Sequence, residues 1–287
     1  MNANISYTSS GIPKIIHQVW INDTFLGNPK KEVPDKWKKC QQEWENLHPD
    51  WLYILWTDDM VLSYLTNYHP DIINHYKNYE YLIQRADMVR YFILYDYGGI
   101  YCDLDMYPLK NIELMIKCNL NCFVYSSNND SITNLFMISP KHSQIMKKIQ
   151  NRLKNPKLPL YCFGKHLKVI YTTGPAMLNN LLLNEINDPF IILPRKLFNP
   201  YSIVNGKLIV SKEEDIKEIY LNTIDDSSTW NEVDTFIYNF MNKHSSIFIA
   251  LGIVFILFII IGLIYYIIKY RKCKKSKDKC DKLCDIR

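Results

Sequence analysis

An uninterrupted apolar run near the end of the chain constrains the fold more than any other feature. Residues 247–268 read IFIALGIVFILFIIIGLIYYII and contain no charged side chain. As an α-helix this run is roughly 33 Å long, which matches the hydrocarbon core of a bilayer. A buried core helix is the alternative interpretation, but core helices of this length normally keep a polar stripe. The run therefore predicts a C-terminal transmembrane helix.

The net positive charge of the chain is concentrated in the residues that follow this apolar run. Residues 269–287 hold nine Lys and Arg residues against three Asp residues, whereas the whole 287-residue chain has a net charge of only +5. The rest of the chain is consequently close to neutral. Nucleic-acid binding depends on a basic surface that neutralises phosphates. We therefore expect no nucleic acid among the partners.

The basic tail also bears on membrane orientation. Clusters of Lys and Arg remain on the cytosolic side of a membrane. This rule favours a single-pass protein of an ER- or Golgi-type endomembrane, with a cytosolic tail and a lumenal body. The N-terminus, MNANISYTSSG, has no apolar segment like that of a cleavable signal. Late insertion of the C-terminal anchor, which would leave the body cytosolic, is the alternative topology.

The body of the sequence alternates between strand-like and helix-like patterns. Strand patterns occupy 14–21, 51–56, 100–109, 122–126 and 134–139, and helix patterns occupy 34–49, 57–68, 79–97, 142–153 and 175–185. Strands that alternate with helices form α/β domains with a largely parallel, doubly wound sheet, which binds ligands at the carboxyl ends of its strands. The sequence predicts that architecture for the body.

Two acidic residues stand at the end of one predicted strand. Asp103 and Asp105 follow the Gly98–Gly99 pair and are separated by one residue, so on a strand their side chains leave the same face. Paired carboxylates are hard oxygen ligands of the kind that Mg²⁺ and Mn²⁺ prefer, and such an ion can hold a diphosphate. A solvated acidic loop is the other interpretation of this short pattern.

The helix before this strand carries a second polar pair. Asp87 and Arg90 are three residues apart, so they share one helical face. The two glycines after the helix permit a tight return that brings this face near the end of the strand. A carboxylate together with a guanidinium suits the hydroxyl groups of a sugar. An intrahelical ion pair without a ligand is the alternative.

Five segments, taken in order, resemble one enzyme family. They are IPKIIHQVW (12–20), HPDWLYILWTDDM (48–60), QRADMVRYFILYDYGGIYCDLDM (84–106), TTGP (172–175) and SSTW (227–230). The set resembles glycosyltransferases with a D-x-D sugar-binding region, which include yeast-type α-mannosyltransferases and, more distantly, clostridial glucosylating toxins. The branch that supplies the catalytic subunits of inositol phosphorylceramide mannosyltransferase is the most similar. The block at 84–106 is the most specific part.

The resemblance implies a GT-A-type, Rossmann-like nucleotide-sugar domain with a mixed, mainly parallel sheet. It also implies four parts, an N-terminal extension at 1–11, a catalytic domain at 12–240, a transmembrane helix at 247–268 and a basic tail at 269–287.

The implied activity is a membrane-anchored, metal-dependent transfer of a hexose with retention of anomeric configuration. Mannose from GDP-mannose is the favoured donor, with a UDP-hexose as the alternative. The acceptor is a lipid-linked molecule such as an inositol phosphosphingolipid, or a glycan. The cofactor is Mn²⁺ or Mg²⁺, and the resemblance leaves a regulatory subunit open.

The resemblance also assigns roles to individual residues. The catalytic set is Asp87, Arg90, Asp103 and Asp105. The metal ligands are Asp103 and Asp105, with Asp225 or Ser228 as further ligands. The donor-binding set comprises His17, Gln18, Trp20, Arg85, Asp87, Arg90 and Asp103. The set that positions the acceptor or the sugar is Thr173, Gly174, Pro175 and Trp230.

The sequence departs from the family pattern near the expected third metal ligand. Members of the family often carry a late His or acidic residue there, followed by a Ser-Trp pair. In this chain no His lies between His166 and His244, and Thr229 separates Ser228 from Trp230. The departure leaves a second hypothesis, in which the chain is a catalytically silent relative that binds sugar or a partner at the membrane.

Overall fold

The chain divides into two compact units, Met1–Trp230 and Asn231–Arg287. The computed structural model describes residues 5–125, 131–160, 162, 164–198, 201–204, 207–210, 219–223 and 244–284.

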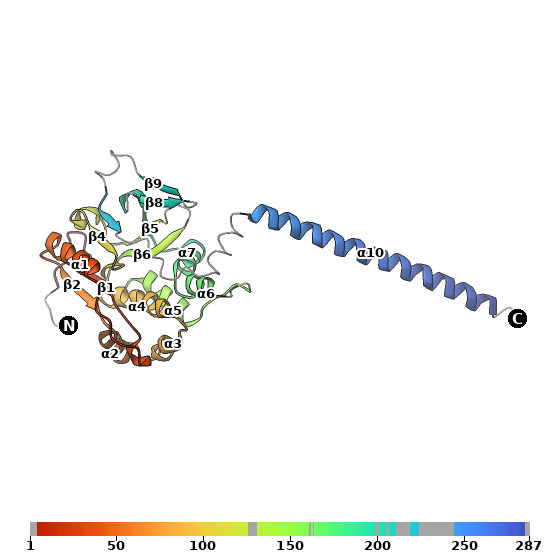
Figure 1. Ribbon diagram of the computed structural model, residues 1–287, viewed down its shortest axis with the longest axis horizontal. Helices are drawn as coiled ribbons and strands as arrows, with labels where there is room; N and C mark the ends of the chain where they lie inside the picture. The colour runs from red at the N-terminus through yellow and green to blue at the C-terminus, as the bar shows by residue number, and fades with distance from the viewer. Residues whose placement is uncertain are drawn as a thin grey trace. The chain divides into compact units, whose positions relative to one another are not determined.

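A six-stranded mixed sheet forms the centre of the first unit (Figure 1). Its strands, in spatial order, are β2 (Leu52–Trp56), β1 (Ile15–Val19), β3 (Gly99–Cys102), β6 (Ile132–Ser139), β5 (Asn121–Tyr125) and β7 (Phe190–Leu193). The β1–β2, β1–β3 and β5–β7 pairs are parallel, whereas β6 runs antiparallel to both β3 and β5. The expected α/β fold with a mixed, mainly parallel sheet is confirmed.

Helices cover both faces of this sheet. They are α1 (Asp35–Leu47), α2 (Asp58–Tyr68), α3 (Ile73–Asn78), α4 (Leu82–Tyr97), α5 (Gln144–Lys154), α6 (Lys165–Thr172) and α7 (Pro175–Asn184). Neighbouring residues of a strand point to opposite faces. Accordingly, Ile15 belongs to one buried cluster with Phe92 of α4, and Ile16 belongs to another with Trp44 of α1. The sheet is therefore buried on both faces.

Smaller elements complete the first unit. Two short antiparallel pairs join β4 (Met106–Pro108) to β10 (Leu221–Thr223) and β8 (Tyr201–Val204) to β9 (Lys207–Val210). Within the described residues, 3-10 helices lie at Thr24–Leu26, Ile112–Met115 and Arg195–Leu197. The sequence patterns predicted neither these elements nor α3, α6 and β7, which are short and lack a long hydrophobic period.

A pair of glycines connects α4 directly to the central strand β3. Gly98 and Gly99 have φ angles of +67° and +91°, in the region that favours glycine. A Cβ at Gly99 would lie 2.4 Å from the carbonyl oxygen of Ile15 on β1. Only glycine allows this approach, so the pair lets β3 begin beside β1 immediately after the helix ends.

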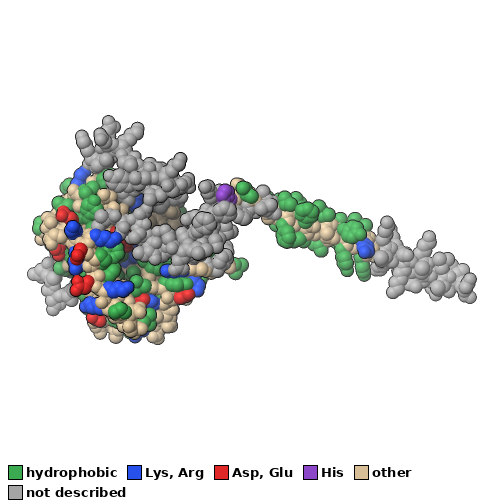
Figure 2. Space-filling model, viewed as in Figure 1, with side chains coloured by type: hydrophobic (Ala, Val, Ile, Leu, Met, Phe, Trp, Pro, Cys, Tyr) green, Lys and Arg blue, Asp and Glu red, His purple; other side chains and the backbone are tan. Residues whose placement is uncertain are grey.

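The described part of the second unit, residues 244–284, contains the long helix α10 (Ser245–Cys284). Its Gly252–Tyr270 segment is long and apolar enough to cross a membrane, by length and composition. Figure 2 shows the hydrophobic side chains along this segment, and they are exposed to solvent.

Candidate active site

Asp103 and Asp105 lie in a tight turn at the carboxyl end of the central strand β3. β3 ends at Cys102 and β4 begins at Met106, so the strand predicted within 100–109 does lead into a loop, and a second short strand follows that loop. The strand is interrupted because its two halves have different partners: β3 pairs with β1 and β6, whereas β4 pairs with β10.

Hydrogen bonds from both neighbouring strands fix this turn. The backbone N–H of Asp103 donates to the carbonyl oxygen of Leu135 on β6 (2.9 Å). On the other side, Nε2 of Gln18 on β1 donates to the carbonyl oxygen of Asp103 (3.0 Å). The two carboxylates are therefore carried by a backbone that the central sheet holds in place.

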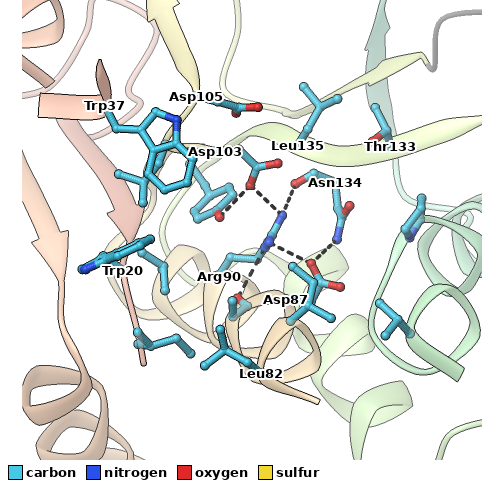
Figure 3. Close-up of a pocket in the computed structure, with 18 of the residues that line it drawn as sticks. Trp20, Trp37, Leu82, Asp87, Arg90, Asp103, Asp105, Thr133, Asn134 and Leu135 are labelled. Carbon is cyan, nitrogen blue, oxygen red and sulfur yellow. Dashed lines mark hydrogen bonds and ion pairs between the residues drawn. The ribbon is translucent and has the colours of Figure 1, made fainter. Parts of the chain in front are cut away.

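A cavity of about 490 Å³ opens beside the turn. This volume lies within the range of roughly 300 to 1,000 Å³ that is typical of small-molecule sites. Its polar lining includes Asn22, Lys31, Asp87, Arg90, Tyr101, Asp103, Asp105, Thr133 and Asn134. These side chains come from segments far apart in the sequence and converge on one space (Figure 3).

Arg90 lies at the centre of the polar side chains (Figure 3). Its Nη1 donates to the carbonyl oxygen of Asn134 (2.9 Å) and pairs with Asp103 (3.1 Å), while Nη2 pairs with Asp87 (2.7 Å). The guanidinium carbon also lies 4.5 Å from the centre of the Tyr101 ring, whose hydroxyl donates to the same Asp103 oxygen (2.9 Å). Arg90 is therefore a fixed positive charge that links two carboxylates.

Asp87 is almost fully buried and receives three donors. Besides Arg90, the side chains of Asn134 (3.0 Å) and Thr173 (3.2 Å) donate to its carboxylate. Burial raises the pKa of Asp87 to about 6, against the opposing effect of Arg90. The carboxylate is thus charged at neutral pH and can accept a further hydrogen bond from a ligand hydroxyl.

The Thr173–Pro175 turn packs against Asp87. A Cβ at Gly174 would lie 3.0 Å from the Cα of Ile170 and 3.5 Å from an oxygen of Asp87. Pro175 occupies the first turn of α7 and lines the cavity. Glycine at 174 therefore permits the close approach that brings Thr173 within hydrogen-bonding distance of Asp87.

Burial shifts the pKa values of both carboxylates at the D-x-D turn. Burial and the neighbouring Asp103 raise the pKa of Asp105 to about 7, although Lys36 and Arg195 act in the opposite direction. Burial also raises the pKa of Asp103, against the effect of Arg90. Two like charges close together disfavour ionisation. A cation bound at this turn would therefore favour the charged form of both carboxylates.

Two tryptophans form an apolar side of the cavity. The rings of Trp20 and Trp37 meet edge to face, with their centres 5.4 Å apart and an interplanar angle of 72°. Nε1 of Trp20 donates to the carbonyl oxygen of Lys31 (2.8 Å), which fixes the ring. Flat aromatic surfaces of this kind suit a planar nucleobase.

The sequence matches the family model described as "Glycosyltransferase sugar-binding region containing DXD motif" over residues 34–126. Inositol phosphoceramide mannosyltransferase 3 of Schizosaccharomyces pombe is 33% identical over 92% of this chain and 67% of the relative. The chain belongs to this family of glycosyltransferases. The resemblance predicted from the five sequence segments is confirmed, and the chain is a glycosyltransferase.

Other curated relatives have similar names. Inositol phosphoceramide mannosyltransferase 2 of Schizosaccharomyces pombe is 30% identical over 89% of this chain and 68% of the relative. Mannosyl phosphorylinositol ceramide synthase CSH1 of Saccharomyces cerevisiae is 31% identical over 88% of this chain and 61% of the relative.

Solved glycosyltransferase structures align with the chain at low identity. The PaToxG glycosyltransferase aligns with a TM-score of 0.43 and 18% identity, over 61% of this chain and 69% of that one. A glycosyltransferase involved in glycosylation of the major capsid of PBCV-1 aligns with a TM-score of 0.43 and 17% identity, over 75% of this chain and 95% of that one.

Six of the predicted site residues of this glycosyltransferase line the cavity: Trp20, Asp87, Arg90, Asp103, Asp105 and Pro175. Thr173 and Gly174 lie directly behind Asp87. Asp225, Ser228 and Trp230 lie outside the described residues. Within the part of the chain that the structure describes, no group of three or more His, Cys, Asp or Glu side chains is arranged to hold a metal ion.

Three predicted donor-binding residues do not line the cavity. His17 is fully buried, its Nδ1 accepts from Trp56 and its Nε2 donates to the carbonyl oxygen of Gly98 (3.0 Å). Burial lowers the pKa of His17 to about 4, so the ring is neutral. Gln18 supports the D-x-D turn, and Arg85 pairs with Asp23.

The cavity also contains residues that no sequence motif indicated. Asn134 lies on β6 and connects Asp87 to the backbone that binds Arg90. Trp37 and Lys31 come from the start of α1 and the loop before it. No local signal distinguishes an asparagine in a strand or a tryptophan in an amphipathic helix, so only their spatial convergence identifies them.

Proposed function

We propose that the chain is a membrane-anchored, metal-dependent mannosyltransferase that transfers mannose from GDP-mannose to an inositol phosphosphingolipid, with retention of anomeric configuration. The observation that carries this proposal is the buried Asp87–Arg90–Asp103 network beside Asp105 at a cavity of about 490 Å³. Mannose and the sphingolipid acceptor are suggested by the names of the yeast relatives.

The donor set of the D-x-D turn fits a divalent cation. Asp103 and Asp105 offer carboxylate oxygens, which Mg²⁺ and Mn²⁺ prefer. Two carboxylates, Asp87 and Asp103, share the guanidinium of Arg90, and the pKa of Asp105 is raised to about 7 by burial and by the neighbouring charge of Asp103. When bound, the ion would neutralise charge that develops on the departing diphosphate. Asp225 or Ser228 remains a proposed further ligand.

The residues of the chain itself would bind and orient the donor. Asp87 would accept a hydrogen bond from a sugar hydroxyl, because its carboxylate is charged and faces the cavity. Arg90 would hold Asp87 and Asp103 in place and add positive charge near the diphosphate. Trp20 and Trp37 would contact the base. The Thr173–Pro175 turn would limit how the sugar sits against Asp87.

The apolar helix would place the enzyme where its lipid acceptor is found. Residues 247–268 would span an endomembrane, with the tail at 269–287 in the cytosol and the catalytic domain at 12–240 in the lumen. In sealed microsomes, a tag after Arg287 should be digested by added protease while the catalytic domain is protected. Protection of the tag with digestion of the domain would reverse this topology.

Release of GDP tests the catalytic proposal. The full-length chain in detergent, given GDP-mannose and Mn²⁺, should release GDP, and Asp105→Ala should reduce the rate by about 10²- to 10³-fold. Asp59→Ala, which changes an exposed carboxylate of α2, serves as the matched control. UDP-glucose and other nucleotide sugars should be poorer donors. If no nucleotide sugar is consumed, the chain is a silent relative and the proposal is wrong.

Transfer to lipid tests the acceptor separately. Vesicles that contain an inositol phosphosphingolipid should become mannosylated, and vesicles that contain the ceramide alone should not. Mannosylation of a soluble glycan but not of the lipid would assign the enzyme to glycan rather than sphingolipid synthesis.

A further inference from the structure

The loop between α5 and α6 lies beside the segment that leads into α4. It comprises residues 155–164. At its start, Pro156 lines a small hollow together with Tyr79. Just after its end, the ammonium group of Lys165 lies 5.7 Å from the centre of the Tyr81 ring. Both ends of the loop are therefore held next to the first residue of α4.

The loop and the start of α4 expose three leucines. Leu82, the first residue of α4, lines the catalytic cavity and is 41% exposed (Figure 3). Leu158 is 47% exposed and Leu160 is fully exposed. A single exposed leucine is ordinary, but exposed apolar side chains gathered on one flank of a site mark an interaction surface. These three residues are called the apolar rim below.

A hydrogen-bonded turn carries the most exposed of these leucines. The backbone N–H of Cys162 donates to the carbonyl oxygen of Pro159 (3.0 Å), which closes a four-residue turn with Leu160 at its first central position. In the sequence, residues 158–163 read LPLYCF and contain no charged side chain. The turn therefore presents an uncharged, apolar side chain to its surroundings.

Two lysines that flank the loop are paired with carboxylates. Lys157 pairs with Glu185 (3.1 Å), and Lys168 of α6 pairs with Glu80 (2.6 Å). Attraction to anionic lipids depends on clustered basic side chains near the membrane surface. Because these two lysines already have acidic partners, the rim is suited to an apolar contact rather than to an electrostatic one.

A lipid bilayer suits this surface better than a protein partner does. The side chains that anchor protein interfaces are mainly Trp, Tyr and Arg, whereas leucine is under-represented among them. Leucines on a protruding turn insert into the boundary between head groups and acyl chains, which adapts to their shape. The bilayer is also within reach, because the chain from Trp230 to the apolar segment at Gly252 spans at most about 75 Å.

We propose that the apolar rim inserts into the head-group boundary of the bilayer and holds the mouth of the catalytic cavity against the membrane. The inference rests on the membrane anchoring in the proposed function. An acceptor lipid would then present its head group to the cavity while its hydrocarbon chains stay in the bilayer. Because the anchor tethers the domain at an effective concentration on the order of millimolar, a contact made by three leucines is sufficient.

Photocrosslinking to lipid tests the rim without requiring turnover. The full-length chain, with a benzophenone amino acid in place of Leu160, is reconstituted in vesicles of neutral phosphatidylcholine. Irradiation should attach about fivefold more lipid at this position than at a benzophenone in place of Leu114. Leu114 is 60% exposed, but the neighbouring Glu113 pairs with Lys14 before the start of β1, at the opposite edge of the sheet from the cavity. Anionic lipid or high salt should change the yield little.

Transfer to an embedded acceptor should depend on the rim, whereas donor hydrolysis should not. The Leu158→Ser/Leu160→Ser double variant should mannosylate an inositol phosphosphingolipid in vesicles about tenfold more slowly. Its release of GDP from GDP-mannose without acceptor should be unchanged. Leu158→Phe/Leu160→Phe, which keeps the apolar surface, should retain most of the transfer rate. Leu114→Ser is the matched control and should leave both rates unchanged.

Several outcomes would overturn the membrane contact. They are equal lipid attachment at positions 160 and 114, attachment of position 160 to a second copy of the chain instead of to lipid, and attachment that requires anionic lipid. Substitutions on an exposed loop rarely affect folding, and an unchanged melting temperature verifies this for each variant. Loss of the chain from floated vesicles would refute the anchor at 247–268 and the rim with it. Lipid attachment at position 160 in a chain that releases no GDP would refute only the catalytic proposal.

Discussion

Two arginines on α4 are equally buried and yet have different surroundings. Arg85 is 2% exposed and pairs through Nε and Nη2 with both oxygens of Asp23. Arg90 is 3% exposed and is shared between Asp87 and Asp103. Five residues separate them on one helix, but only Arg90 lines the cavity.

The difference lies in the local charge balance. Around Arg85, one guanidinium meets one carboxylate in a closed two-point contact, which leaves no net charge. Around Arg90, one guanidinium is shared by two carboxylates, and all three groups line the cavity. A closed buried pair has a structural role, whereas a shared network that lines a cavity can bind a cation and a polar ligand.

Replacing each arginine with methionine should separate these roles most strongly. Arg85→Met leaves Asp23 buried without its partner and should lower the free energy of unfolding by about 3 to 5 kcal/mol, while the folded fraction keeps its activity. Arg90→Met should reduce GDP release by about 10³-fold, which corresponds to about 4 kcal/mol. Urea unfolding and the GDP-release assay give the two readouts. Equal losses of activity in both variants would contradict the comparison.

Replacing the carboxylate partners of the two arginines should likewise separate a structural role from a catalytic role, with somewhat smaller losses of stability and activity. Asp23→Asn should destabilise the fold, because it removes the only charge that compensates Arg85 among the described contacts. Asp103→Asn should reduce GDP release by about 10²-fold without lowering the melting temperature, because Arg90 keeps Asp87 as its partner. A large loss of stability in Asp103→Asn would show that the open network is structural as well.

Cation binding should depend on pH because one of the proposed ligands, Asp105, titrates near neutral pH. The pKa of Asp105 is raised to about 7, so protons compete with the cation below that value. Affinity for Mn²⁺ should therefore rise by up to about tenfold per pH unit between pH 5 and 7 and become constant above. Quenching of Trp20 and Trp37 fluorescence offers a measurement. A flat profile from pH 5 to 8 would contradict a raised pKa at this turn.

The raised pKa of Asp105 should also make the free energy of unfolding depend on pH. Stability should fall as pH rises, whereas affinity for Mn²⁺ should increase. An acid whose folded pKa lies above its unfolded value of 3.8 binds more protons when folded. The metal-free chain should accordingly lose stability as pH rises from about 4 to 7, and Asp105→Asn should remove this contribution. Thermal unfolding across that pH range with a chelator present tests the sign.

The smallest effect is expected at a residue that supports the network. Asn134→Ala removes one of the three donors to Asp87 and should reduce GDP release by about five- to tenfold, equivalent to about 1 kcal/mol. Asn67→Ala, at an exposed position of α2, is the matched control. A loss as large as that of Arg90→Met would mean that Asn134 contacts the substrate itself.

Much of the fold and several site residues can be predicted from local patterns. Helices α1, α2, α4, α5 and α7 and strands β1, β2, β5 and β6 lie where periodicity predicted them. The D-x-D pair and the Asp87–Arg90 spacing identified four residues that line the cavity. These features are readable because each depends on residues within a few positions of one another.

The sequence by itself determined the alternating α/β order, the apolar helix and the acidic pair, because hydrophobic period, length and spacing are local properties. Only the tertiary structure decided that Arg90 rather than Arg85 faces the cavity, and that His17 and Gln18 support the site from behind. The deciding contacts join Asp87 to Asn134, 47 positions away, and to Thr173, 86 positions away. Such contacts depend on how strands and helices from distant parts of the chain pack together, and this packing cannot be predicted from the local spacing of residues.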